Sequence, residues 1–203
     1  MLRPYEPLLS IVPEGWGAIV ALGSAAALLF AGGAVVPSVA LAAVVPAAAG
    51  FWADRRHGVS CKPRGVLSPV NGTVIHRREC HDPVLGREAI RIVIRTSLWG
   101  SYCLRAPVSG QVCLLPQGSA TQVSRIRLDD NDDVLVAASG GLLGARPVMV
   151  AVGDRVGQGR RCGLRRLARQ IEITIPAGAR LEVALGSRVR SGETLLATLL
   201  RKP

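Results

Sequence analysis

The chain has 203 residues, a formal net charge of +11 at neutral pH, and only 3% aromatic residues. Its five cysteines are odd in number and contain no CxxC pair, which excludes a disulfide framework and a thiolate zinc site. The excess of positive charge favours an anionic partner. Nucleic acid is excluded as the expected partner, because the sequence contains no recognisable reading module and no aromatic stacking platform.

A charge-free run lies near the N-terminus, between Glu14 and Asp54. One membrane-spanning helix needs about 20 apolar residues, and this run is nearly twice as long. Gly32 and Gly33 interrupt it, which predicts two helices over residues 17–31 and 36–52 joined by a tight turn. After an N-terminal segment at 1–14, we therefore expect a membrane-inserted, transmembrane helical hairpin over residues 15–53. The alternative is a hairpin buried inside a soluble protein.

Basic residues flank this run on both sides, with Arg3 before it and Arg55 and Arg56 after it. Positive flanks tend to stay on the cytoplasmic side of a membrane. We therefore expect the bacterial inner (cytoplasmic) membrane as the location, with the rest of the protein on its cytoplasmic side and membrane lipids as partners.

Residues 54–203 have a different character and predict a mainly β domain. Apolar segments are short, rich in β-branched residues and separated by Gly and Pro, as in strands. The expected strands are VIHRR, AIRIVIR, QVCLL, VSRIRL, DVLVAA, PVMVAV, IEITI, LEVAL and TLLATLL. The acidic stretch at 128–136 lacks the spacing of a calcium loop, so we expect a hairpin turn there and no metal site.

Two phrases occur twice in this domain. SPVNGTV at 68–74 matches APVSGQV at 106–112, and VAVGDRVGQG at 150–159 matches VALGSRVRSG at 183–192. These phrases resemble the hammerhead turns of biotinyl-type and lipoyl-type domains, which predicts a hammerhead-like β-sandwich or barrel. A carrier domain needs a modifiable lysine at a hairpin tip, and Lys202 is the only lysine after residue 64. We therefore do not expect a carrier function.

The order of motifs resembles the short bacterial and archaeal phosphatidylserine decarboxylases. An apolar hairpin ends in FWADRR at 51–56, and SPVNG, SYCLRAPVSG, GLLGARPVMVAVGDRV and finally GSRVRSGET follow. The resemblance implies a proenzyme in which an Asp and a His activate a Ser. That Ser cleaves the chain before itself and becomes a pyruvoyl group, which decarboxylates phosphatidylserine through a Schiff base.

All three of these positions depart from the family pattern. Asn71 stands in place of the Asp and cannot supply a negative charge. Tyr102 stands in place of the His, and a phenol is a poor base at neutral pH. Arg169 stands at the cleavage position and is not a nucleophile. Ser187 lies too late in the closing phrase to replace it.

The sequence therefore predicts a non-catalytic phosphatidylserine decarboxylase-like protein with no pyruvoyl group. Its expected role is that of an accessory subunit or assembly factor in a larger membrane complex. Anionic phospholipid binding and an active decarboxylase that uses displaced residues are the alternatives. The expected contacts to anionic lipid or protein are Arg105, Arg165, Arg166 and Arg169.

Overall fold

The computed structural model of the chain divides into two compact units, residues 1–56 and 57–203. The structure describes residues 9–11, 13–51, 53–55, 62–96, 102–113, 123–139, 148–149, 151–165 and 168–200.

The first unit is a helical hairpin, as the sequence predicts. Helix α1 covers Pro13–Ala31 and helix α2 covers Val35–Phe51. The turn between them uses Gly33 at φ 79°, a left-handed conformation that glycine adopts without steric cost. Strand β1 (Leu9–Ile11) pairs antiparallel with β2 (Ala53–Arg55) and joins the two outer ends of the hairpin.

The prediction that this hairpin is transmembrane is not supported. Among the described residues, neither helix combines the length and the hydropathy that a membrane crossing requires. The 17 residues of α2 extend over about 26 Å, whereas the apolar core of a bilayer is about 30 Å thick. The turn at Gly33 divides the long apolar run into two pieces, and each piece is short.

Apolar side chains nevertheless cover the outside of the hairpin. Leu28, Phe30 and Val36, close to the turn, are 73%, 64% and 81% exposed. Trp16, near the other end of α1, is 53% exposed. Large apolar patches of this kind mark contact surfaces rather than ordinary solvated faces.

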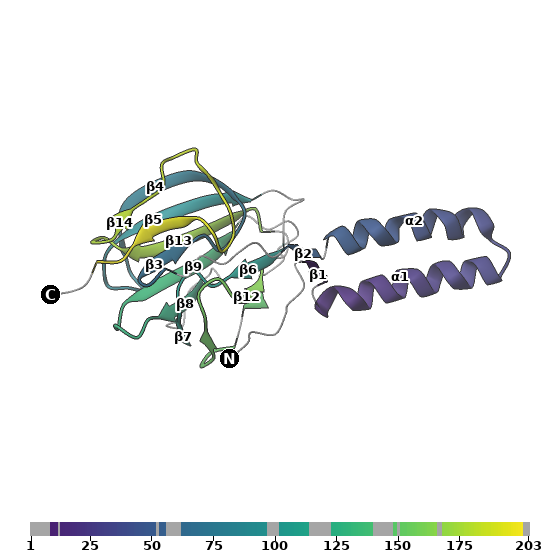
Figure 1. Cartoon of the computed structure of the whole chain (residues 1–203), viewed down its shortest axis with the longest axis horizontal. Helices are drawn as coiled ribbons and strands as arrows, with labels where there is room; N and C mark the ends of the chain where they lie inside the picture. The colour runs from purple at the N-terminus through teal and green to yellow at the C-terminus, as the bar shows by residue number, and fades with distance from the viewer. Residues whose placement is uncertain are drawn as a thin grey trace. The chain divides into compact units, whose positions relative to one another are not determined.

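The second unit consists of antiparallel sheets (Figure 1). The largest has eight strands in the order β11-β7-β8-β9-β13-β5-β4-β15. Two sheets of three strands have the orders β10-β12-β6 and β14-β16-β3. The strands are β3 (Gly65–Leu67), β4 (Gly72–Asp82), β5 (Arg87–Thr96), β6 (Cys103–Arg105), β7 (Gly110–Cys113), β8 (Val123–Arg127), β9 (Asp133–Ser139), β10 (Val148–Met149), β11 (Arg155–Val156), β12 (Arg161–Leu164), β13 (Gln170–Pro176), β14 (Arg180–Leu181), β15 (Arg188–Val189) and β16 (Leu195–Thr198).

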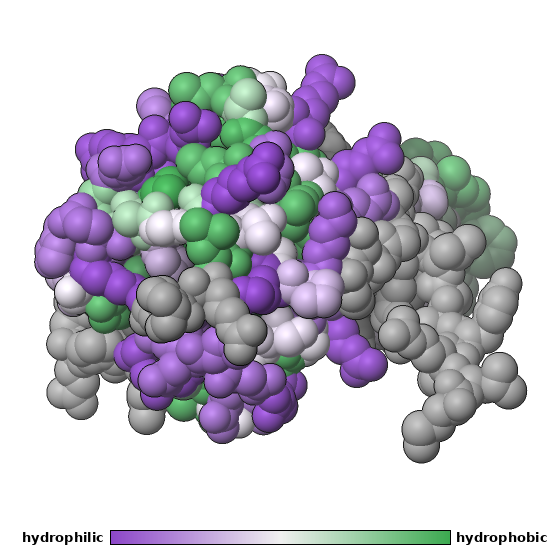
Figure 2. Space-filling model, turned by 60° about the vertical axis from the view of Figure 1, so that its left-hand side comes forward, coloured by the Kyte–Doolittle hydropathy of each residue, from purple (hydrophilic) through white to green (hydrophobic). Residues whose placement is uncertain are grey.

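The core of this unit follows from alternation along the strands. Ile171, Ile173 and Ile175 of β13 are fully buried, and so are Ile92 and Ile94 of the neighbouring β5. The other face of the large sheet carries polar and charged side chains. Figure 2 shows hydrophilic side chains in several groups around smaller hydrophobic areas on one face of the molecule.

The two repeated phrases form two equivalent turns with the same backbone hydrogen bonds. Gly72 pairs with Val189, and Gly110 pairs with Val156 in the same way. In one copy Gly186 N–H donates to the carbonyl of Val74 at 2.8 Å, and in the other Gly153 N–H donates to Val112, also at 2.8 Å. The second unit is therefore built from two halves, and each half pairs an early strand with a later one.

The strand predictions are confirmed for the long strands and fail for some short ones. VIHRR, AIRIVIR, VSRIRL, DVLVAA and IEITI lie in β4, β5, β8, β9 and β13. Of the predicted LEVAL strand, only Leu181 is in a strand. Strands β3, β6, β11, β12 and β15 have two to four residues each and were not predicted. Of the predicted PVMVAV strand, Val148 and Met149 form β10, Ala151 and Val152 are not in a strand, and the other two residues lie outside the described residues.

Candidate functional site

The three positions singled out by the sequence meet around Thr96, the last residue of β5. Thr96 N–H donates to the carbonyl of Arg169 at 2.8 Å, so Arg169 lies directly before β13 and beside the end of β5. In the sheet Thr96 pairs with Gly72, the residue after Asn71. Tyr102 lies directly before β6 and reaches the same region through Arg165, whose guanidinium lies over its ring.

Arg165 occupies the middle of this site and is almost fully buried, with 1% of its surface exposed. Its guanidinium lies over the ring of Tyr102, 4.7 Å from the ring centroid, in a cation–π contact. Its Nη1 donates to Thr96 Oγ1 and to the carbonyl of Ala168, both at 3.0 Å. Thr96 Oγ1 also donates to the Ala168 carbonyl at 3.0 Å.

These contacts fix the peptide immediately before Arg169. The Ala168 carbonyl receives two donors from buried side chains, and Ala168 N–H donates back to the carbonyl of Arg165. Arg165 and Ala168 are therefore joined by hydrogen bonds in both directions. The resemblance to the decarboxylases implies that a nucleophile at position 169 would attack the Ala168 carbonyl.

Burial shifts the pKa of both partners in the cation–π contact. Burial raises the pKa of Tyr102, and the positive charge of Arg165 offsets part of that rise. Burial lowers the pKa of Arg165, and the negative charge of ionised Tyr102 would oppose this. The net direction for Tyr102 is upward, so its phenol stays protonated at neutral pH and cannot accept a proton as a base.

Asn71 makes a structural contact that the sequence interpretation did not anticipate. Its Oδ1 accepts a hydrogen bond from the backbone N–H of Ser191 at 2.7 Å. In the other half of the unit, Ser109 Oγ accepts from the backbone N–H of Gln158 at 2.9 Å. Both acceptors lie just before the glycine of their repeated phrase. The side chain at position 71 therefore stabilises the turn. A comparison of the two phrases in the sequence indicates this role.

The predicted arginine contacts do not form one exposed group. Arg165 is buried, and Arg105 is 6% exposed with its Nη1 donating to the carbonyl of Gly159 at 3.1 Å. Arg169 is exposed. Arg166 lies outside the described residues. Of the predicted binding residues whose side chains are described, Arg169 alone faces solvent.

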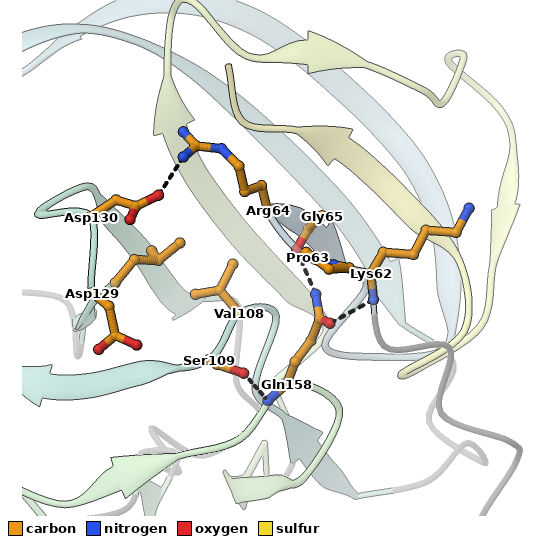
Figure 3. A pocket seen from close by; sticks show the side chains of 10 residues that line it. Lys62, Pro63, Arg64, Gly65, Val108, Ser109, Asp129, Asp130 and Gln158 are labelled. Carbon is orange, nitrogen blue, oxygen red and sulfur yellow. Dashed lines mark hydrogen bonds and ion pairs between the residues drawn. The ribbon is translucent and has the colours of Figure 1, made fainter. Parts of the chain in front are cut away.

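A pocket of about 180 Å³ lies in the other half of the unit (Figure 3). Gln158 crosses it, accepting from Lys62 N–H at 2.9 Å and donating to the carbonyl of Gly65. Arg64 forms an ion pair with Asp130 at its rim. The lining residues are Lys62, Pro63, Arg64, Gly65, Val108, Ser109, Leu128, Asp129, Asp130 and Gln158. The lining residues include no histidine and no cysteine.

The fold and the site define an antiparallel β unit with two equivalent glycine turns, preceded by a helical hairpin. No protein-family model matches the chain. It is similar to the phosphatidylserine decarboxylase proenzyme of Nitrosomonas europaea, with 28% identity over 216 residues that cover 97% of this chain and 99% of that protein. The corresponding proenzyme of Burkholderia multivorans is 26% identical over 165 residues, covering 73% and 77%.

The chain is thus a distant homologue of phosphatidylserine decarboxylase proenzymes along most of its length. Among solved structures, it is similar to the glucose permease IIA from Mycoplasma capricolum, with a TM-score of 0.46 and 20% identity over 70% of this chain and 98% of that one. This score is too low to establish a shared fold.

Proposed function

We propose that this chain is a non-catalytic homologue of the phosphatidylserine decarboxylases that keeps a hammerhead-like β unit for binding. The observation that supports this most is the residue at the start of β13. Arg169 lies there, and no Ser, Thr or Cys occurs between Gly163 and Ile173. An arginine side chain cannot attack a carbonyl and cannot become a pyruvoyl group, so the residues present do not fit that prosthetic group.

The surroundings of Arg169 support the same proposal. A base at position 102 would need an unprotonated nitrogen or oxygen, whereas Tyr102 is a buried phenol under a guanidinium. Asn71 is neutral and its oxygen already accepts a backbone hydrogen bond. Loss of groups that act as a unit removes nearly all of their joint rate enhancement.

The intact mass of the purified protein tests this proposal. We expect a single chain of 21.3 kDa and no release of carbon dioxide from phosphatidylserine. Two fragments divided before residue 169 would overturn the proposal and favour the alternative, an active decarboxylase.

We further propose that the binding role is that of an accessory subunit or assembly factor at the cytoplasmic face of a bacterial membrane. The exposed apolar side chains of the hairpin, among them Leu28, Phe30 and Val36, support this, because such side chains are stabilised by contact with lipid or with an apolar protein surface. Extraction in mild detergent tests it: a stoichiometric protein partner is expected to co-purify with the full chain. The same extraction from a strain that expresses L28Q/F30Q/V36Q is expected to lose that partner, whereas a full chain that purifies alone would contradict a subunit role.

A further inference from the structure

The outward face of the large sheet carries a group of arginines without acidic partners. Thr73 of β4 pairs with Arg95 of β5 on one side and with Arg188 of β15 on the other. Directly paired residues share a face, so the two guanidinium groups lie on the same side of the sheet, with Cα atoms about 10 Å apart. Both arginines are exposed.

Arg78 extends this group along β4. It pairs with Arg91 of β5, on the same face as Arg95, because Ile92 and Ile94 point into the core between them. Two charges of the same sign that lie directly across from each other on paired strands destabilise the pair. Arg91 is neutralised by Asp82 at 3.2 Å and by Glu172 at 3.9 Å, but Arg78 is not. We call Arg78, Arg95 and Arg188 the sheet arginines.

The sheet arginines differ from three other exposed arginines of the chain, Arg155, Arg180 and Arg190. In the part of the chain that the structure describes, no carboxylate lies within ion-pair distance of any of the three. By contrast, Arg155 pairs with Asp129, Arg180 with Glu182, and Arg190 with Glu193. Those three side chains are 72%, 75% and 73% exposed, so exposure alone does not explain the difference.

We infer that the sheet arginines form a docking surface for the anionic headgroups of a lipid bilayer. The face carries guanidinium groups on three adjacent strands, β15, β4 and β5, and guanidinium recognises phosphate through paired donors. Strands β4, β5 and β15 contain no Phe, Tyr or Trp. Single-stranded nucleic acid binds mainly by stacking on such rings, so the face fits a lipid surface better than an RNA.

This surface rests on the proposed role at a membrane and adds a lipid contact to the proposed protein partner. It does not depend on Arg105, Arg165 or Arg166. It also places the lipid contact on the outward side of the sheet, away from the buried network around Thr96. The test therefore separates it from the question of catalysis, which the intact mass answers independently.

Vesicle flotation with the full chain tests the inference. Vesicles of phosphatidylcholine alone report the contribution of the apolar hairpin, and vesicles that also contain phosphatidylglycerol report the added effect of negative charge. We expect R78Q/R95Q/R188Q to lose at least about tenfold of the binding that depends on phosphatidylglycerol, since each cation near an anionic surface contributes substantially. R78K/R95K/R188K keeps the charges and is expected to keep most of that binding.

The matched control is R155Q/R180Q/R190Q, which also removes three of the positive charges but leaves the sheet arginines in place. It is expected to bind nearly as well as the natural sequence. Equal losses in the two glutamine variants would mean that net charge alone matters and would overturn the inference. The inference would also be overturned if the natural sequence did not prefer vesicles with phosphatidylglycerol, or if R78Q/R95Q/R188Q bound normally. Displacement of the natural sequence from vesicles by an unstructured RNA that binds these arginines would overturn it as well.

Discussion

Arg165 and Arg169 are four positions apart and have opposite surroundings. Arg165 is buried against Tyr102 and donates to the Ala168 carbonyl before β13, whereas Arg169 is exposed to solvent. A buried cation of this size is stable only when its donors are satisfied. Two neighbouring arginines of one basic segment therefore have separate roles, one in stability and one at the surface.

This difference predicts the effect of removing each side chain. Arg165→Ala leaves a cavity beside Tyr102 and removes a donor from the Ala168 carbonyl, so we expect the free energy of unfolding to fall by about 2–4 kcal/mol. Arg169→Ala is the matched control and is expected to change it by less than about 0.5 kcal/mol. Urea unfolding measures both, and equal effects would contradict the assigned surroundings.

Restoring the nucleophile alone is expected to leave the chain intact. Arg169→Ser places a hydroxyl next to the Ala168 carbonyl, but Tyr102 is a protonated phenol and Asn71 carries no charge. We expect no detectable cleavage by intact mass after prolonged incubation. A fragment that begins at residue 169 would show that another residue supplies the base.

At the scale of elements, the two repeated glycine turns impose the same steric limit. A Cβ on Gly72 would lie 2.3 Å from the carbonyl oxygen of Arg95, and one on Gly110 would lie 2.2 Å from that of Arg127. We expect Gly72→Ala and Gly110→Ala each to lower the free energy of unfolding by about 2–3 kcal/mol, because the backbone must move. Gly178→Ala meets no atom within 4 Å and is the control. A loss in one turn only would contradict their equivalence.

The ion pairs of Asp133 in the hairpin of β8 and β9 predict that the stability of the fold depends on pH in the acid range. Burial tends to raise the pKa of Asp133, but hydrogen bonds from Arg125 and Arg127 outweigh it and the pKa is lowered. A lowered pKa in the folded state adds stability above the ordinary value near 3.9, and this stability is lost as the pH falls through the lowered value. Asp133→Asn is expected to cost about 1–3 kcal/mol at neutral pH and much less in strong acid.

Chemical unfolding of the natural sequence and of Asp133→Asn, at neutral pH and at about pH 2, measures this difference. Asp129→Asn is the control, because the Asp129 side chain is 71% exposed and its ion pair with Arg155 lies in solvent. A difference between Asp133→Asn and the natural sequence that stays constant with pH would contradict the assigned cause.

The sequence predicted the long elements, but not the contacts around Thr96. Alternation in β5 and β13 and the charge-free run of the hairpin gave patterns long enough to interpret. The short strands β11 and β15 have two residues each, and their pairing depends on turns rather than on periodicity. Burial of Arg165 could not be anticipated, because a run of arginines normally indicates a solvated face and only tertiary contacts place this one against Tyr102.

At the scale of the whole molecule, the hairpin and the β unit differ in how far their apolar side chains are exposed. The β unit buries its own apolar core, whereas the hairpin exposes side chains such as Phe30 and Val36. We expect L28Q/F30Q/V36Q to reduce binding to detergent micelles and self-association, as measured by sedimentation. Thermal unfolding of the β unit is expected to stay the same, and a shift of more than a few degrees would show that the two units stabilise each other.

The pairing of the earliest and latest strands of the β unit has a consequence during synthesis. Strand β3 pairs with β16, and Arg64 Nε donates to the carbonyl of Leu199, 135 residues further on. At ordinary rates of translation, β3 leaves the ribosome on the order of ten seconds before its partner exists. The nascent chain must keep this unpaired edge from aggregating until β16 emerges, so folding of the β unit is completed only after β16 has been synthesised.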